Sequence, residues 1–262
     1  MIRTILIIIL TTLFSCCDNN SLTQDIPVES FDEWGGKLKV TLPLTEYSSG
    51  AAAILLPGGG YSSSDNNGVD AQWGQFLAKS GIAAFSLGYT LPQGNPHQPI
   101  DDVISTYEYI KSNAARLSVN PDSIGIIGFS AGGHLASVIS TIYSDEVNLN
   151  FQVLFYPVIS MEDDITHLPS QKCLLGENPT SQQKMDFSTY LHVTERTPRC
   201  LIFVNEEDHI VPFQNSCLYK GALEKLWIEC QMVTFPGAGH GWMLEQVPDR
   251  SAIEQMIGWI KK

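Results

Sequence analysis

The chain has few basic residues. Its 15 lysines and arginines stand against 28 aspartates and glutamates, which leaves a formal net charge of −13. Nucleic acids and anionic membrane surfaces attract basic proteins and repel carboxylates, so this charge argues against either as a binding partner. We expect a neutral substrate instead.

A metal-binding cysteine pattern is also absent. Of the six cysteines, the four beyond the N-terminal segment show neither CxxC spacing nor a neighbouring histidine pattern. They are Cys173, Cys200, Cys217 and Cys230. We interpret them as core residues, although two of them could form a disulfide in an exported protein if they lie close enough. The sequence therefore predicts no metal site.

The chain begins with Arg3 followed by an apolar run that is too short to span a bilayer, as in secretory signal peptides. Ser15 stands directly before Cys16, which resembles the lipobox at which bacteria cleave a signal and acylate the cysteine. We therefore expect residues 1–15 to be a lipoprotein signal peptide, Cys16 to be lipidated, and residues 16–36 to be an anchor and tether. An ordinary signal peptide or an uncleaved anchor is the alternative. The protein would then be an exported bacterial lipoprotein, held at the membrane by its anchor.

From Lys37 onward, short apolar runs alternate with amphipathic stretches, and there is no internal repeat. This alternation predicts one α/β domain over residues 37–262, with a mostly parallel, doubly wound sheet flanked by helices. The predicted strands are Leu38–Leu44, Ala51–Leu56, Ile82–Leu87, Ser123–Phe129, Phe151–Tyr156, Cys200–Val204 and Gln231–Phe235, the first at an edge of the sheet. The predicted helices are Val69–Lys79, Ile100–Arg116, Ala131–Tyr143, Phe213–Leu226 and Pro248–Ile260. The irregular segment Pro157–Pro198 is expected to form a lid or a wall of a binding site.

A GxSxG pattern stands where a predicted strand ends and a predicted helix begins. Its residues are Gly128, Phe129, Ser130, Ala131 and Gly132. A serine on such a sharp turn is held in a strained conformation with its oxygen exposed, and the glycines leave room for the turn. The N-terminal amides of the following helix favour developing negative charge at the same place. We therefore predict that Ser130 is a nucleophile.

Three successive glycines follow the predicted strand Ala51–Leu56. The sequence PGGGY at 57–61 resembles the HGGG segment that supplies oxyanion-hole amides in lipases and esterases, with proline in place of histidine. We predict that the amides of Gly59, Gly60 and Ala131 donate to the oxyanion of a tetrahedral intermediate. A flexible turn or a phosphate loop is the alternative, but neither Gly-Lys-Ser nor Gly-Lys-Thr follows the glycines.

A serine nucleophile needs a base, and the base needs a carboxylate to orient it. In hydrolases with this serine turn, the order along the chain is serine, acid, histidine. Residues 204–212 read VNEEDHIVP, in which Glu206, Glu207 and Asp208 compete for the role of the acid. We favour Asp208, because it stands directly before the HIVP turn, where the acid of such hydrolases usually falls.

His240 is the predicted base. It lies between small residues in the sequence GAGHGW, after the last predicted strand and before the last predicted helix, so its side chain can reach Ser130. His209 is the main rival. It adjoins the acid, and we do not expect it also to accept the serine proton.

The other histidines have weaker sequence contexts. His134 lies one helical turn beyond the nucleophile, and we expect it to have a structural role. His167 and His192 lie in the long irregular segment, and we interpret them as solvated loop residues. His97 either lines the substrate pocket or fills a proline-rich turn, and the sequence leaves these alternatives open.

Six segments together resemble one family. They are PGGGY at 57–61, GFSAGGHLA at 128–136, YPVIS at 156–160, LLG at 174–176, VP at 211–212 and GAGHGW at 237–242. From about Ala51 to its C-terminus, the chain is similar to the bacterial carbohydrate esterases that include acetylxylan esterases and bifunctional acetylxylan and feruloyl esterases. The resemblance implies the α/β-hydrolase fold and no cofactor. It also implies removal of acetyl groups, with feruloyl as the alternative, from plant cell-wall polysaccharide such as xylan by Ser130, Asp208 and His240.

Two other functions remain open from the sequence. One is a serine peptidase resembling the prolyl oligopeptidase family, which shares the fold and the triad. The other is a glycan-binding protein on an inactive hydrolase scaffold, although the nucleophile, glycine segment, acid and base together argue against it. We favour the esterase, with an acylated carbohydrate as its substrate.

Overall fold

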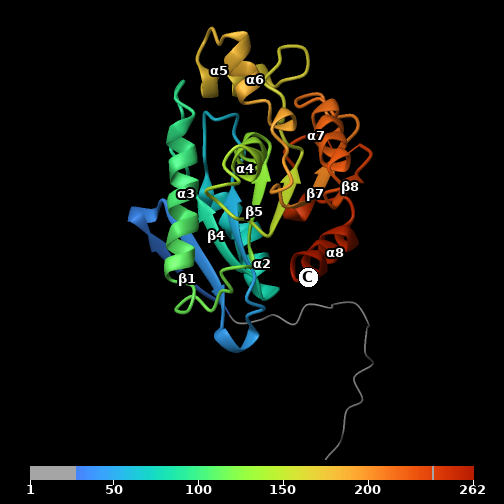
Figure 1. The fold of residues 1–262 in the computed structure, drawn as a ribbon. Coiled ribbons are helices and arrows are strands. Elements are labelled where there is room, and N and C mark those ends of the chain that lie inside the picture. The colour runs from blue at the N-terminus through green and yellow to red at the C-terminus, as the bar shows by residue number, and fades with distance from the viewer. Residues whose placement is uncertain (1–27, 238) are drawn as a thin grey trace, which may run out of the picture.

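The computed structural model describes residues 28–237 and 239–262 (Figure 1). They form an eight-stranded sheet in the order β1-β2-β4-β3-β5-β6-β7-β8. The strands are β1 Val28–Glu33, β2 Leu38–Pro43, β3 Ala52–Leu56, β4 Ala83–Leu87, β5 Ile124–Phe129, β6 Phe151–Phe155, β7 Arg199–Val204 and β8 Cys230–Thr234. β2 pairs antiparallel with β1 and β4, and the other neighbours are parallel. The predicted mostly parallel sheet is confirmed.

The central strands are apolar on both faces because both faces of the sheet are covered. All five residues of β3 are buried, with Ile54 in one core layer and Leu55 in the other. Burial on both sides is typical of parallel strands. The sequence therefore shows these strands as unbroken apolar runs, which is why they could be predicted.

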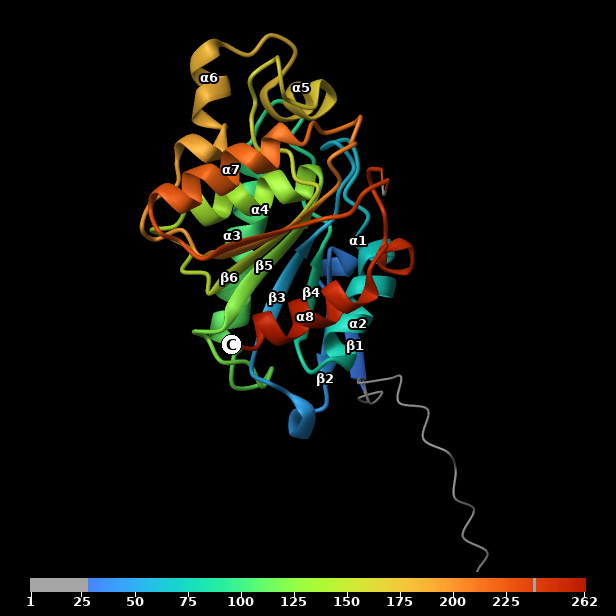
Figure 2. The same ribbon diagram turned by 90° about the vertical axis from the view of Figure 1, so that its right-hand side faces the viewer.

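Helices cover the two faces of the sheet (Figure 2). α3, α4 and α7 pack on one face through side chains such as Leu135 and Tyr219, and α2 and α8 pack on the other through Leu77 and Trp259. The helices are α1 Asn66–Val69, α2 Gln75–Lys79, α3 His97–Ser112, α4 Ala131–Thr141, α5 Leu168–Leu175, α6 Ser181–Asp186, α7 Gln214–Lys225 and α8 Arg250–Ile260. A π-helical turn, Asp70–Gly74, joins α1 to α2, and the 3-10 turns are Trp34–Gly36, Thr45–Tyr47, Thr189–Leu191 and Leu244–Gln246. The five predicted helices are present within a few residues of their expected bounds.

The expectation that Leu38–Leu44 lies at an edge of the sheet is wrong. β1 pairs with β2 on its outer side and forms that edge. The predicted boundary between tether and domain, at residue 37, is therefore placed too late. Three of the six residues of β1 are exposed, so this segment has no apolar run that would reveal a strand. The predicted signal peptide, Cys16 and the first part of the tether lie outside the described residues.

The segment Pro157–Pro198 contains two helices that we did not predict, α5 and α6. Figures 1 and 2 show both at the end of the molecule opposite the C-terminus. Five of the six residues of α6 are exposed, and the helix begins with a capping box between Thr180 and Gln183. A short polar helix that begins with such a cap shows little apolar periodicity, so we predicted only an irregular segment here.

The described helices include none that is long and apolar enough to cross a membrane. Cys173, Cys200, Cys217 and Cys230 are free thiols. Cys200 is buried, as expected of a core residue, whereas Cys217 is exposed, so our interpretation is wrong for that cysteine.

Candidate active site

The glycine segment and the GxSxG turn meet at one point of the sheet. β3 and β5 are neighbours in the sheet. The strand that follows β3 in the chain, β4, lies on one side of this pair, and the strand that follows β5, β6, lies on the other. The loops that leave two such strands diverge, and ligands of open α/β sheets bind in the crevice between them. Residues 57–60 follow β3 and Ser130 follows β5, so both stand at this crevice.

Ser130 has a strained backbone conformation. Its φ of 54° and ψ of −115° lie in a region that residues other than glycine rarely adopt. The Ser130 amide donates to the Phe155 carbonyl over 2.9 Å, and the Ser130 carbonyl accepts from the His134 amide over 3.1 Å. A Cβ added at Gly132 would lie 2.2 Å from the Leu56 carbonyl oxygen, so only glycine fits where the turn packs against β3. These contacts hold the serine at the tip of the turn.

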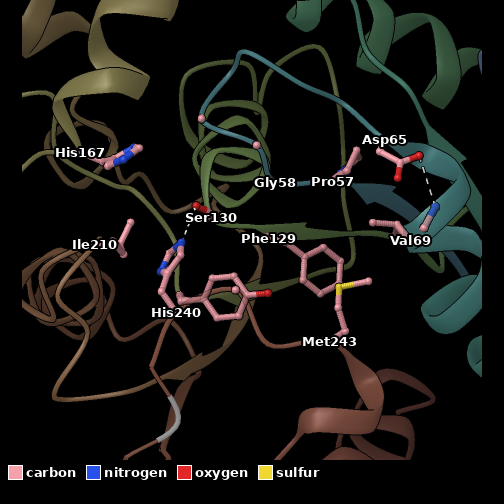
Figure 3. A pocket seen from close by; sticks show the side chains of 15 residues that line it. Pro57, Gly58, Asp65, Val69, Phe129, Ser130, His167, Ile210, His240 and Met243 are labelled. Atoms are coloured by element: carbon pink, nitrogen blue, oxygen red, sulfur yellow. Dashed lines mark hydrogen bonds between the residues drawn. The ribbon is translucent and has the colours of Figure 1, made fainter.

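Ser130, His240 and Asp208 form one hydrogen-bonded series. His240 Nε2 lies 2.9 Å from Ser130 Oγ, as Figure 3 shows, and His240 Nδ1 lies 2.6 Å from Asp208 Oδ2. The Asp208 side chain is fully buried, and the His240 side chain is 14% exposed. A carboxylate at Nδ1 keeps the hydrogen on that nitrogen, so Nε2 is left to accept a proton from the serine.

Asp208 is held on both of its oxygens. Oδ2 faces His240, and Oδ1 accepts hydrogen bonds from the amides of Ile210, at 2.8 Å, and Val211, at 2.9 Å. The two glutamates that precede Asp208 are exposed. Of the three competing carboxylates, the structure therefore brings Asp208 to the histidine.

The Tyr156 ring packs against the His240 ring. The two rings meet edge to face, with centroids 4.7 Å apart. The Tyr156 hydroxyl donates to the Trp242 carbonyl over 2.9 Å, and burial raises the pKa of Tyr156. The hydroxyl therefore stays protonated and keeps this bond, which fixes the ring that limits the movement of His240.

The three predicted oxyanion donors lie around the nucleophile. Gly59 and Gly60 line the same cavity as Ser130, and Ala131 follows the serine as the first residue of α4. Gly59 has a φ of 122°, and a Cβ there would lie 2.6 Å from the Ser63 carbonyl oxygen, so this position requires glycine. Within residues 28–237 and 239–262, none of the three amides donates to a protein acceptor. These three amides are therefore without a protein partner in the described part of the chain.

A cavity of about 430 Å³ opens over Ser130. Figure 3 shows Val69 and Met243 on one side of Ser130, and His167 and Ile210 on the other. The volume falls within the usual range of small-molecule sites. The side of the cavity with Val69 and Met243 also carries the Asp65 carboxylate, and the other side carries the His167 ring.

His134 has the structural role that we predicted. It is fully buried, and burial lowers its pKa to about 4. The neutral ring lies between two partners: Nδ1 is 2.8 Å from the Tyr61 hydroxyl, and Nε2 is 2.8 Å from the Phe187 carbonyl oxygen. Nε2 must donate to the carbonyl, so Nδ1 accepts from the tyrosine. His134 thus ties α4 to the glycine segment and to the residues after α6.

The remaining candidate groups lie away from the cavity. His97 is exposed at the start of α3 and does not line the cavity. Of our two alternatives, a residue of the proline-rich turn therefore holds, and a residue of the substrate pocket does not. His209 is exposed and does not line the cavity. In the part of the chain that the structure describes, no group of three or more histidine, cysteine or acidic side chains is placed to hold a metal ion.

His167 is the residue that sequence reasoning missed. We interpreted it as solvated, but it is half-buried and lines the cavity beside the glycine segment. A Cβ added at Gly60 would lie 3.6 Å from His167 Cε1. No local pattern marks this residue, because its position depends on how the whole segment Pro157–Pro198 folds back over the sheet. Of the segment Pro157–Pro198, which we expected to form a lid or a wall, His167 alone lines this cavity.

A family model described as BD-FAE matches residues 38–223. The chain belongs to the BD-FAE family. The matched range includes Ser130 and Asp208 and ends before His240, so His240 is joined to the site by its two hydrogen-bond contacts and lies outside the match.

The chain is also similar to individual proteins of known sequence or structure. The chain is 37% identical over 211 residues to an acetylxylan esterase from Xylanibacter ruminicola, and the alignment covers 79% of this chain and 44% of that protein. The chain thus spans less than half the length of this curated relative. Among solved structures, it is similar to an acetyl ester-xyloside bifunctional hydrolase from Caldicellulosiruptor lactoaceticus, with a TM-score of 0.76, 26% identity, and 92% and 97% of the two chains covered. An α/β hydrolase from a Medee basin deep-sea metagenome library gives a TM-score of 0.67 at 25% identity, with 90% and 97% covered. The fold is the α/β-hydrolase fold.

Proposed function

We propose that this chain is a serine carboxylesterase that removes acetyl groups from an acylated plant cell-wall polysaccharide such as xylan. The observation that carries the proposal is the series from Ser130 through His240 to Asp208, with distances of 2.9 and 2.6 Å, at an open cavity. The 37% identity to an acetylxylan esterase supports the choice of substrate. The acidic chain also suits a neutral ligand.

The proposed reaction has two steps. Ser130 Oγ attacks the ester carbonyl carbon while His240 Nε2 accepts the serine proton, and the tetrahedral intermediate then breaks its bond to the sugar oxygen, which takes that proton from His240. Water attacks the acyl-enzyme in the second step, again with His240 as the base, and acetate leaves. Asp208 keeps the hydrogen on Nδ1 and stabilises the imidazolium that forms.

We assign the amides of Gly59, Gly60 and Ala131 to the oxyanion of that intermediate. Each donor of this kind typically lowers the barrier by about 3 kcal/mol, because it is already aligned before charge develops. The proposed chemistry needs no cofactor, since the side chains and amides supply the nucleophile, the base and the charge stabilisation.

Three alternatives would share the same cavity. A feruloyl group could replace the acetyl group, and about 430 Å³ leaves room for a larger acyl chain. A serine peptidase resembling prolyl oligopeptidases would use the same triad on an amide. A glycan-binding protein on an inactive scaffold would bind the polysaccharide and leave it intact. These alternatives differ in the product released.

Turnover of 4-nitrophenyl acetate tests the proposed nucleophile. We expect Ser130→Ala to lose at least about 10⁴-fold in kcat, because the base then has no hydroxyl to activate. Ser181→Ala, at an exposed serine that begins α6, is the matched control and should keep wild-type turnover. Equal turnover in wild type and Ser130→Ala would refute the assignment, and no turnover in either would favour the binding protein.

Product release then identifies the substrate. Acetate from acetylated xylan is the expected product. Ferulate from arabinoxylan in place of acetate would favour the feruloyl alternative, and cleavage of a chromogenic peptide without ester hydrolysis would favour the peptidase.

We further propose that the protein is exported and anchored to a membrane through a lipid on Cys16. The proposal is supported by Arg3, the apolar run that follows it, and the small residue Ser15 directly before the cysteine. An external location would give the site access to polysaccharide that does not enter the cell.

A further inference from the structure

His167 stands next to the reacting groups without belonging to the triad. It directly precedes α5, it is half-buried, and its Cε1 would lie 3.6 Å from a Cβ added at Gly60. Figure 3 shows its ring across the cavity from Val69 and Met243. A substrate bound at Ser130 therefore lies beside this ring.

The buried partner of His167 determines which ring nitrogen carries the hydrogen. His167 Nδ1 lies 2.8 Å from Ser170 Oγ, and Ser170 is fully buried. Among the described residues, the Ser170 side chain has no other hydrogen-bond partner. A buried hydroxyl that kept its hydrogen unpaired would be unfavourable, so Ser170 donates to Nδ1.

The hydrogen of the neutral His167 ring is then on Nε2. Burial lowers the pKa of His167, with a further lowering from nearby His240, which agrees with a neutral ring. Nε2 has no acceptor among the described residues. The cavity thus presents one hydrogen-bond donor whose orientation is fixed by a buried serine.

The position of His167 indicates which part of the substrate it contacts. The leaving oxygen must lie close to His240, because this histidine supplies its proton. In Figure 3, His240 and Ile210 lie together on the side of Ser130 that also holds His167. Ile210 is 52% exposed, although it is apolar. A sugar unit has hydroxyl groups and apolar C–H surfaces, so it can contact both residues.

We propose that His167 determines specificity for carbohydrate esters by donating from Nε2 to a hydroxyl oxygen of the sugar whose acetyl group is removed. The inference rests on the proposed function and adds the residue that recognises the alcohol part of the substrate. Val69 and Met243, on the opposite side, then face the acyl part.

Two acetyl esters separate this role from a role in the chemistry. An acetylated xylo-oligosaccharide has sugar hydroxyls, whereas 4-nitrophenyl acetate has none. We expect His167→Ala to raise KM for the oligosaccharide about fivefold to tenfold with little change in kcat, because it removes one hydrogen bond made equally in ground and transition states. Both constants for 4-nitrophenyl acetate should stay within about twofold of wild type.

Further variants exclude a loss of folding as the cause. His167→Gln places an amide N–H near the position of Nε2 and should recover part of the affinity for the oligosaccharide. His192→Ala is the matched control: this half-buried histidine lies in the same segment, bonds to the Met185 carbonyl and does not line the cavity. It should behave as wild type with both substrates.

Each other outcome overturns the inference. Equal losses on both esters would mean that His167 acts on the reacting groups or holds the site together, and no loss on either would mean that it does not contact the sugar. A wild-type protein that hydrolyses 4-nitrophenyl acetate but releases no acetate from any acetylated sugar would refute the proposed substrate as well, and so identifies the failure of the proposed function separately.

Discussion

Replacing Asp208 with asparagine tests the proposed triad most sharply, because the structure predicts which way the new amide would face. Asp208 Oδ1 accepts from two backbone amides, those of Ile210 and Val211, at 2.8 and 2.9 Å. In Asp208→Asn, the amide oxygen must remain with these two donors, since an NH₂ group there would oppose both. The NH₂ group then faces His240 Nδ1.

This orientation would reverse the tautomer of His240. The asparagine NH₂ donates to Nδ1, so the histidine hydrogen moves to Nε2, which lies 2.9 Å from Ser130 Oγ. A protonated Nε2 cannot accept the serine proton. A loss of this kind reduces kcat about 10⁴-fold in serine hydrolases, or about 5 kcal/mol of transition-state stabilisation at 1.36 kcal/mol for each factor of ten.

Steady-state hydrolysis of 4-nitrophenyl acetate measures the effect. We expect kcat/KM of Asp208→Asn to fall about 10⁴-fold with an unchanged circular dichroism spectrum. Glu207→Gln removes the same charge from the exposed neighbour and should keep wild-type activity. A loss smaller than about tenfold in Asp208→Asn would refute the reasoning, because a base with the wrong tautomer could not work at that rate.

Two further predictions concern stability and location. Because burial lowers the pKa of His134 from 6.5 to about 4, the unfolded chain binds a proton between these pH values that the folded chain does not, so stability decreases as the pH is lowered through this window, by about 1.4 kcal/mol per pH unit. Urea unfolding at about pH 7 and about pH 5 should therefore differ less in His134→Gln than in wild type, and an equal difference would contradict this account. In bacterial cells, we expect the wild type in the membrane fraction and Cys16→Ala outside it; a wild-type protein that stays in the soluble fraction would contradict the proposed anchor.

Much of the site could be predicted from the sequence because its motifs are local. The GxSxG turn requires glycine at 132, where any Cβ would meet the Leu56 carbonyl, and the segment at 57–61 requires glycine at 59 for its positive φ. Such requirements appear as residue types at neighbouring positions. Ser130 and the glycine segment could therefore be identified without knowing how the chain folds.

The acid and the base were predicted from their order along the chain, and only the folded chain brings them together. Three carboxylates stand in a row at 206–208, and the exposure of the first two leaves Asp208 as the one that reaches His240. Exposure depends on how the loop after β7 packs. The place of Asp208 directly before the HIVP turn favoured it in the sequence, but the sequence does not show which of the three adjacent carboxylates is buried.

The features that we missed have a common cause. Half of the residues of β1 and five of the six residues of α6 are exposed, so neither shows the apolar pattern by which elements are recognised. His167 has no motif around it, and only the path of the segment Pro157–Pro198 brings it to the cavity.

The sequence by itself determined the order of the central strands and helices along the chain, and the chemical groups at the serine turn. Buried strands and tight turns restrict which residue types can occupy their positions, so both leave a pattern in the sequence. Only the tertiary structure decided which strand forms the edge, which carboxylate meets His240 and which histidine faces the substrate. Those outcomes depend on contacts between segments far apart in the chain, and such contacts leave no pattern in either segment alone.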